Sequence, residues 1–355
     1  MTIPGQQDFS RTGKRQNLVA LSKQGHRLIK AGAYQEAFEV FTQALAIEAD
    51  NPYILTGIAD SLRAQKEYAG AEDYYRRVLD RDPNNLFALR GLGDTFRDRG
   101  EHDRAIVFWQ RYLRQRPQDI FVLTRVADGA KMLGRFDEAE NGYRKILSIR
   151  PDDRYCLMGL ADLYHKFGRE AQAIEFYERV LERDPQMVNI LTILGNLYRR
   201  RRELKSAQRC YERVLQLDPH NAYALYGMGE TCRWRCDYRG AIGHWEEILR
   251  HHEGNTGLLS RMGDAHRNLG DGETAEHFYR QILDRDYDRY ALLGMAKLRC
   301  QQERFAEMFV IFEEFLRREG ESARVWEEMR EILLRCEGKC ALPPDMQRKL
   351  EALDR

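Results

Sequence analysis

The residues best suited to contact another molecule lie in one stretch that begins at Ala222. Read as a helix with about 100° per residue, this stretch places five side chains on a single stripe: Tyr223, Tyr226, Glu230, Arg233 and Trp234. Tyr, Trp and Arg contribute most of the binding energy at protein interfaces. The stripe therefore predicts a contact surface for a partner, unless Trp234 packs locally against the turn at Cys236.

Residue types that support metal or covalent chemistry do not form a recognisable pattern. Some groups resemble metal ligands in type alone: His251-His252, Cys232/Cys236 and Cys336/Cys340. Cys232 falls at a position expected to be buried, and the two cysteine pairs lie far apart along the chain, so we expect no metal and no other cofactor. No nucleophile, base and orienting group recur together, and no glycine-rich phosphate loop follows a strand, so we expect no enzyme.

The stripe belongs to a unit that recurs along the chain from about Leu18 to Ser322. One copy is LFALRGLGDTFRDRGEHDRAIVFWQRYLRQRPQD, residues 86 to 119. In this copy, apolar residues at i, i+3, i+4 and i+7 predict one buried face on each of two helices: Leu89, Leu92, Gly93 and Phe96, then Ala105, Trp109, Tyr112 and Leu113. Gly100 ends the first helix and Pro117 ends the second. Each unit is therefore predicted to be a helix hairpin.

Small and large residues alternate at fixed positions of the unit. First helices carry Gly25, Ala59, Gly93, Ala127, Ala161, Gly195, Gly229, Gly263 and Ala296, and second helices carry Ala37, Ala71, Ala105, Ala139, Ala173, Ala207, Ala241 and Ala275. Four residues after these alanines, and after Met308 in the last unit, comes the aromatic core position: Phe41, Tyr75, Trp109, Tyr143, Tyr177, Tyr211, Trp245, Tyr279 and Phe312. This alternation predicts close helix crossings filled by buried rings.

The pattern of Leu89 to Pro117 closely resembles the tetratricopeptide repeat family, over about Leu18 to Ser322. The resemblance implies an all-α fold, a right-handed superhelical solenoid of about nine hairpins. It also implies a concave groove, lined by the first helices, that binds peptide segments of partner proteins.

The chain is expected to have three parts. Residues 1–17 are polar, with Pro4, Gly5 and Gly13, and are interpreted as a mobile lead-in. Residues 18–322 form the array of repeats. Residues 323–355 are interpreted as C-terminal capping helices, the first built around Trp326 and the last starting at Pro343-Pro344.

Composition excludes strong electrostatic targeting. The chain of 355 residues has 57 basic and 56 acidic residues, so no long-range field favours nucleic acid or an anionic membrane. No run of about 18 apolar residues and no signal-peptide pattern occurs. Seven cysteines without a CxxC motif favour reduced thiols. We therefore expect a cytoplasmic protein that does not bind membranes.

In the family, the stripe opposite the buried face of each first helix looks into the groove. Its second position is aromatic at Tyr53, Phe87, Phe121, Tyr155, Tyr223 and Tyr290. These rings are either a platform for a ligand or wedges against the preceding repeat.

Two further positions of this stripe carry opposite charges. The ninth is acidic at Asp60, Asp94, Asp128, Asp162, Glu230 and Asp264, and the twelfth is basic at Arg63, Arg97, Lys131, Arg199, Arg233 and Arg267. Such charges form either a solvated ladder, with pairs worth less than about 1 kcal/mol, or a surface that exchanges its pairs for those of a bound peptide.

The favoured function is a non-catalytic scaffold that binds a peptide or helical segment of a partner protein. The candidate partner-binding residues are Tyr223, Tyr226, Glu230, Arg233, Trp234, Arg199, Arg267, Tyr53, Phe87, Phe121 and Tyr155. The alternative is binding of single-stranded RNA by the rings and arginines, against which the acidic residue beside each arginine argues. Self-association through the convex face or the ends stays open.

Overall fold

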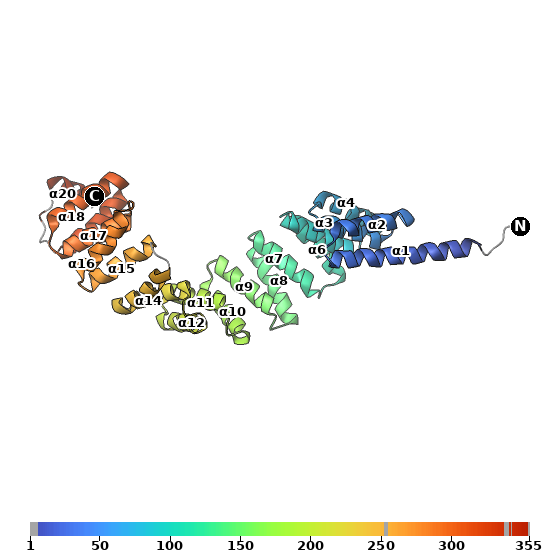
Figure 1. The fold of residues 1–355 in the computed structure, drawn as a ribbon, viewed down its shortest axis with the longest axis horizontal. Helices are drawn as coiled ribbons and strands as arrows, with labels where there is room; N and C mark the ends of the chain where they lie inside the picture. Colours follow the sequence, from blue (N-terminus) through green and yellow to red (C-terminus); the bar gives the residue numbers. More distant parts are fainter. Residues whose placement is uncertain (1–5, 252–254, 337–340, 342, 354–355) are drawn as a thin grey trace. The chain divides into compact units, whose positions relative to one another are not determined.

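The computed structural model describes residues 6–251, 255–336, 341 and 343–353. Within these residues it contains twenty α-helices and no β-strand (Figure 1). Consecutive helices pack as hairpins, α1 with α2, α3 with α4 and onward to α17 with α18. The prediction of an all-α fold built from helix hairpins is therefore confirmed.

The chain divides into two compact units, Met1–Arg183 and Asp184–Arg355. The helices of the first unit are α1 (Gln6–Lys30), α2 (Tyr34–Ile47), α3 (Pro52–Ala64), α4 (Tyr68–Arg81), α5 (Leu86–Asp98), α6 (His102–Gln115), α7 (Ile120–Met132), α8 (Phe136–Ile149), α9 (Arg154–Lys166) and α10 (Glu170–Arg183). Those of the second are α11 (Val188–Arg200), α12 (Leu204–Leu217), α13 (Ala222–Trp234), α14 (Tyr238–His251), α15 (Thr256–Asn268), α16 (Gly272–Leu283), α17 (Arg289–Gln301), α18 (Phe305–Glu319), α19 (Ala323–Leu334) and α20 (Pro344–Leu353).

Local sequence explains where the first helix of each hairpin begins. An Asn or Asp side chain accepts a hydrogen bond from the backbone at most of these starts: Asn51, Asn85, Asp119, Asp153, Asn221, Asn255 and Asp288. Short polar side chains at this position satisfy amides that the helix leaves unpaired. The cap fixes the register of the helix, so it also fixes which residues of the next turns face outward.

The turn inside each hairpin contains one residue with a positive φ, the left-handed backbone conformation that was expected for Gly100. Glycine fills this position in several hairpins, but Lys66, Arg202, Cys236 and Glu303 adopt the same positive φ elsewhere. Non-glycine residues pay a steric cost in this conformation. The geometry of the hairpin is therefore retained even where the sequence of the turn varies.

Every residue at the aromatic core position is at most 1% exposed. Where the small residue of a hairpin is glycine, the ring lies against it, as predicted, for example Phe41 against Gly25 and Trp109 against Gly93. Several rings also lie against a glycine of the following first helix. Gly57 faces Phe41 and Gly91 faces Tyr75 in this way. The glycine on the following helix, at the sixth position of the repeat, was not predicted to be a contact site. It lets one ring join two successive hairpins.

Gly91 gives a direct test of this packing. A Cβ atom added there would overlap the ring of Tyr75, which is fully buried and cannot move into solvent. We expect Gly91→Ala to lower the free energy of unfolding by about 1–3 kcal/mol, measured by urea unfolding. Gly243→Ala is the control, because Gly243 lies in α14 with no atom near its added Cβ. That change should instead stabilise by about 0.5–1 kcal/mol, and equal effects at both sites would contradict the packing argument.

Both ends of the chain are helical in the residues that the structure describes. The sequence predicts a mobile lead-in over residues 1–17, but α1 begins at Gln6, so the described part of this segment is helical. At the other end, Trp326 and Met329 of α19 and Met346 of α20 join Phe312 and Phe315 in one apolar cluster. None of the helices in the described ranges combines the length and apolar character that crossing a membrane requires.

Candidate functional site

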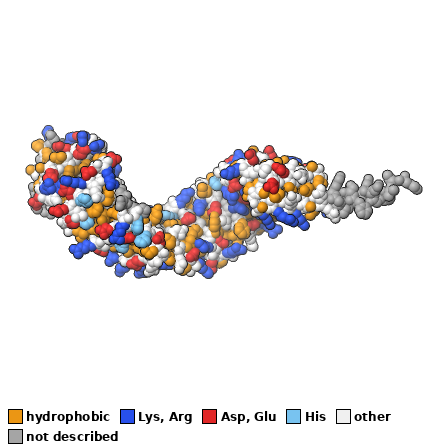
Figure 2. Space-filling view, viewed as in Figure 1, with side chains coloured by type: hydrophobic (Ala, Val, Ile, Leu, Met, Phe, Trp, Pro, Cys, Tyr) orange, Lys and Arg blue, Asp and Glu red, His pale blue; other side chains and the backbone are white. Residues whose placement is uncertain are grey.

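The aromatic residues at the second position of the first helices lie on the surface. Their exposed fractions run from 56% at Phe87 to 80% at Phe121, so they are not wedged into the hairpin packing. Tyr53 and Phe87 lie with ring centroids 6.3 Å apart, and the Tyr155 hydroxyl donates to Asp128 over 3.0 Å. On the face drawn in Figure 2, hydrophobic side chains are interspersed with charged ones.

The carboxylates at the ninth position are not simply a solvated ladder. Where the aromatic core position of the same hairpin holds Tyr, its hydroxyl donates to the residue at the ninth position: Tyr75 to Asp60, Tyr143 to Asp128, Tyr177 to Asp162, Tyr211 to Asn196 and Tyr279 to Asp264. These hydrogen bonds tie the ninth-position residue of the first helix to the buried ring of the same hairpin. The acidic ladder is therefore partly structural.

Burial governs the protonation of these pairs. It raises the pKa of Asp60, although the hydrogen bond from Tyr75 and the charge of Arg63 act in the opposite direction. Burial and the neighbouring carboxylate together raise the pKa of the Tyr75 hydroxyl well above its usual range. Because the phenol keeps its proton, Tyr75 acts as the donor.

The two hairpins with Trp at the aromatic core position lack this tyrosine, and their ninth-position carboxylates contact arginines instead. In the first unit, Asp94 is 6% exposed, and its Oδ1 lies 3.1 Å from Nε of Arg125 and 3.9 Å from Nη1 of Arg97. Arg125 comes from the following first helix. Asp94 thereby links α5 to α7.

The second unit repeats this arrangement with a larger cluster around Glu230, which is 3% exposed. Its oxygens lie 2.8 Å from Nη2 of Arg233, 3.2 Å from Nε of Arg261 and 4.0 Å from Nη1 of Arg199. Burial lowers the pKa of the Arg233 guanidinium, but its bond to Glu230 more than offsets this, and the net pKa is raised. The cluster therefore places three arginines around one carboxylate, and Arg233 keeps its charge there.

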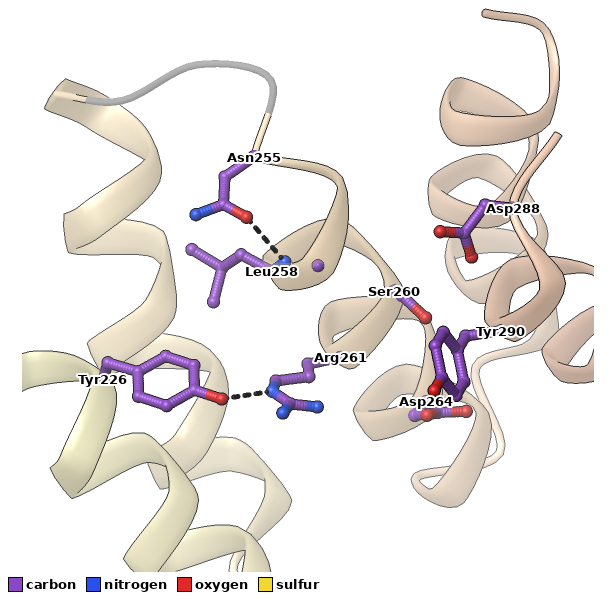
Figure 3. A pocket seen from close by; sticks show the side chains of 9 residues that line it. Tyr226, Asn255, Leu258, Ser260, Arg261, Asp264, Asp288 and Tyr290 are labelled. Carbon is purple, nitrogen blue, oxygen red and sulfur yellow. Dashed lines mark hydrogen bonds between the residues drawn. The ribbon is translucent and has the colours of Figure 1, made fainter. Parts of the chain in front are cut away.

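A pocket of about 500 Å³ lies beside this cluster. It is lined by Tyr226, Asn255, Gly257, Leu258, Ser260, Arg261, Asp264, Asp288 and Tyr290, from α13, α15, α17 and the segments just before α15 and α17. Nε of Arg261 donates to the Tyr226 hydroxyl over 2.8 Å. Figure 3 shows this pair on one side and Ser260, Asp264 and Tyr290 gathered on the other. The pocket offers donors, acceptors and two aromatic rings to a ligand.

The structure unites only some of the predicted site residues. Tyr226, Glu230, Arg233 and Arg199 come together in the second unit, and Tyr223 is 77% exposed on the same helix. The predicted exposure of Glu230 is wrong, because this residue is buried beneath its arginines. Trp234 is half-buried, with the guanidinium of Arg202 3.2 Å from its ring centroid.

Arg267 is likewise buried, 7% exposed, and pairs with Asp264 over 3.5 Å. Tyr53, Phe87, Phe121 and Tyr155 all belong to the first unit. Arg261 was not among the predicted residues, although it stands where most repeats have glycine, as at Gly57, Gly91, Gly159 and Gly227. The sequence could have indicated its role, because an arginine replaces the glycine directly after a hairpin that contains Trp.

The comparison with known families identifies the repeat. Models of the tetratricopeptide repeat match residues 22–86, 56–120, 131–197 and 188–221, which together make up more than half of the chain. No curated protein matches it.

Solved structures with similar folds are also tetratricopeptide repeat proteins. The C-terminal part of such a protein from Cytophaga hutchinsonii is 18% identical, with a TM-score of 0.61, over 68% of this chain and 99% of that one. One from Parabacteroides merdae is 18% identical, with a TM-score of 0.48, over 71% of this chain and 99% of that one. At such identities the likeness concerns the fold. The helix hairpins, the buried aromatic positions and the family matches lead to one conclusion, that this chain belongs to the tetratricopeptide repeat family.

Proposed function

We propose that this protein is a non-catalytic scaffold whose second unit holds a segment of a partner protein in the pocket between Tyr226 and Tyr290. Tetratricopeptide repeats are protein-interaction scaffolds, and this pocket lies on their first helices. The observation that carries the proposal is the pairing of Tyr226 with Arg261 across the pocket from the exposed ring of Tyr290. Arginine and tyrosine in a partly enclosed cavity are the usual anchors of an interface.

The chemistry of the pocket suits a peptide rather than a nucleic acid. A polypeptide presents amide donors and carbonyl acceptors along its length, which the Ser260 hydroxyl, the Asp264 and Asp288 carboxylates and Arg261 can satisfy. A phosphate backbone would meet both carboxylates, and like charges repel it. The described lining residues include no His, Cys or Lys, so we propose no catalytic step.

The exposed rings of the first unit extend the proposal to a second contact region. Tyr53, Phe87, Phe121 and Tyr155 project from successive first helices and are each more than half exposed. Rigid aromatic side chains lose little conformational entropy when they bind. We propose that they add contact area for the same class of ligand, an extended segment of a partner protein.

Affinity capture with the full chain, followed by Kd measurement on the partner it retains, tests the proposal. Tyr290→Ala should weaken that partner by at least about tenfold, because Tyr290 lines the pocket but is 66% exposed and contributes little to the core. Tyr226→Phe removes only the hydroxyl that Arg261 contacts, so it should cause a smaller loss.

Val310→Ala is the matched control, because Val310 is 65% exposed in the same unit and lies outside the pocket. It should bind as the wild type does. If the Tyr290 and Tyr226 variants also bind every retained partner with wild-type Kd, the pocket is not the binding site.

A further inference from the structure

An arginine anchors the second helix of several hairpins to the loop that precedes the hairpin. Its guanidinium donates to a backbone carbonyl of that loop: Arg77 to Ala49 over 3.4 Å, Arg111 to Pro83 over 2.8 Å, Arg179 to Pro151 over 3.1 Å and Arg213 to Pro185 over 2.6 Å. One turn later on two of these helices, a second arginine pairs with an aspartate of the same loop, Arg81 with Asp50 and Arg183 with Asp152. We call this arrangement the arginine anchor.

In the hairpin of α13 and α14, all three side-chain positions of the arginine anchor hold a different type of residue. Glu247 stands at the position of Arg213, one repeat later, and His251 stands at the position of Arg183. His220 stands at the loop position of Asp152. Two cations and an acid have thus become one acid and two imidazoles, so the arginine contacts cannot form here.

The three replacements converge in space. Nδ1 of His220 lies 3.0 Å from Oε1 of Glu247, and Nε2 of His251 lies 3.7 Å from the same oxygen. One ligand atom from each residue lies within 4.8 Å of the others. In a tetrahedral zinc site, bond lengths of about 2.0–2.2 Å place neighbouring ligand atoms about 3.3–3.5 Å apart. The two distances to Oε1 bracket that separation.

We propose that His220, Glu247 and His251 form a site for a divalent transition-metal ion of the zinc type, which joins α14 to the loop before α13. Imidazole nitrogen and carboxylate oxygen are ligands that this class of ion accepts. Glu247 and His251 are one helical turn apart and face the same way. Three protein ligands leave a fourth position for water or for a group from another molecule.

The surroundings favour a cation at this place. Helix α14 ends at His251, and the carbonyl end of a helix stabilises positive charge. The side chains of His220 and His251 are 65% and 55% exposed, so they can turn toward an ion without repacking the core. Arg250 pairs with Oε2 of Glu247 and leaves Oε1 to the histidines. Its charge weakens the site, so Arg250→Ala should bind the ion more tightly.

Calorimetric titration of the metal-free full chain with ZnCl₂ tests the site. The wild type should bind one equivalent of zinc, and the Glu247→Arg variant should not bind this equivalent. This variant restores the residue found at Arg213 and can re-form the arginine anchor, so it should melt at the wild-type temperature in EDTA. His220→Ala, which alters an exposed side chain, should weaken binding by at least the roughly 10–100-fold that loss of a supporting group costs.

Matched variants separate this site from other zinc ligands. His277→Ala alters an exposed histidine of α16, and Cys232→Ser/Cys236→Ser removes the two thiols of the same hairpin. Both should retain the single equivalent. The proposal is overturned if the wild type binds no zinc, if either of these variants loses the equivalent, or if Glu247→Arg and His220→Ala bind it as tightly as the wild type.

Discussion

Replacing Trp109 with Ala is expected to lower the free energy of unfolding by about 3–5 kcal/mol. Trp109 is fully buried at the aromatic core position of α6, against Gly93 of α5. Among the described residues its indole Nε1 has no hydrogen-bond partner, so the loss is one of packing. The substitution leaves a cavity. The surrounding helices cannot readily close it, because they also pack against the hairpins on both sides. Urea unfolding followed by circular dichroism at 222 nm measures the change.

Val107→Ala is the control for this prediction. Val107 lies on the same helix but is 54% exposed, so its truncation should change stability by less than about 0.5 kcal/mol. Because repeats contact only their neighbours, the Trp109 variant should also broaden the transition of the first unit. An effect no larger than that of Val107→Ala would show that the ring does not hold adjacent hairpins together.

The second large effect is expected at Glu230. Glu230→Ala removes the carboxylate that accepts hydrogen bonds from Arg233 and forms ion pairs with Arg261 and Arg199. Loss of one partner from a fully buried pair costs about 3–5 kcal/mol, and hydrogen bonds to charged groups contribute about 1.5–3 kcal/mol. The arginine side chains are 19–39% exposed and can regain some water. We therefore expect a loss of about 2–3 kcal/mol.

Thermal and urea unfolding of the Glu230 variant should be compared with Glu246→Ala. Glu246 is an exposed residue of α14, and its removal should be nearly neutral. Glu230→Ala should also free the guanidinium of Arg261 beside the pocket and change partner affinity at a temperature where the variant is still folded. If stability and affinity both match those of Glu246→Ala, the carboxylate does not organise the arginines.

The sequence predicted the hairpins and their buried rings because these depend on local periodicity. Leu89, Leu92 and Phe96 recur at helical spacing, and Trp109 follows the small Ala105 by one turn. These contacts lie within one hairpin, so reading one unit was sufficient. The buried positions of Trp109 and Trp245 are confirmed.

The hydrogen bonds from the core tyrosines to the residues at the ninth position were not predicted, because they link positions on different helices. A comparison of the repeats reveals a correlation between the aromatic core position and the ninth position. Where the aromatic core position is Phe41 or Phe312, which has no hydroxyl, the ninth position is His26 or Lys297 rather than an acid. Where it is Tyr, the ninth position is Asp or Asn. A helical wheel of one unit cannot reveal this correlation.

The burial of Glu230 and the partial cover of Trp234 were not predicted, for a related reason. A wheel assigns one direction to each side chain, whereas the following first helix and the preceding turn also cover parts of this stripe. Arg261 reaches Glu230 from α15, and Arg202 covers Trp234 from the turn before α12. Those contacts depend on the packing of successive hairpins, which no single unit encodes.

The ring that joins successive hairpins also limits how this gene can lengthen or shorten by recombination between its repeats. A hairpin with a Tyr or Phe ring is followed in most cases by a glycine, such as Gly91 after Tyr75. A hairpin with Trp is followed by an arginine, Arg125 after Trp109 and Arg261 after Trp245. A duplication that placed Arg261 behind Tyr75 would put a long cation where the ring needs an empty surface. Rearranged arrays that keep each ring with its own following residue are therefore expected to be more stable than arrays that separate the two.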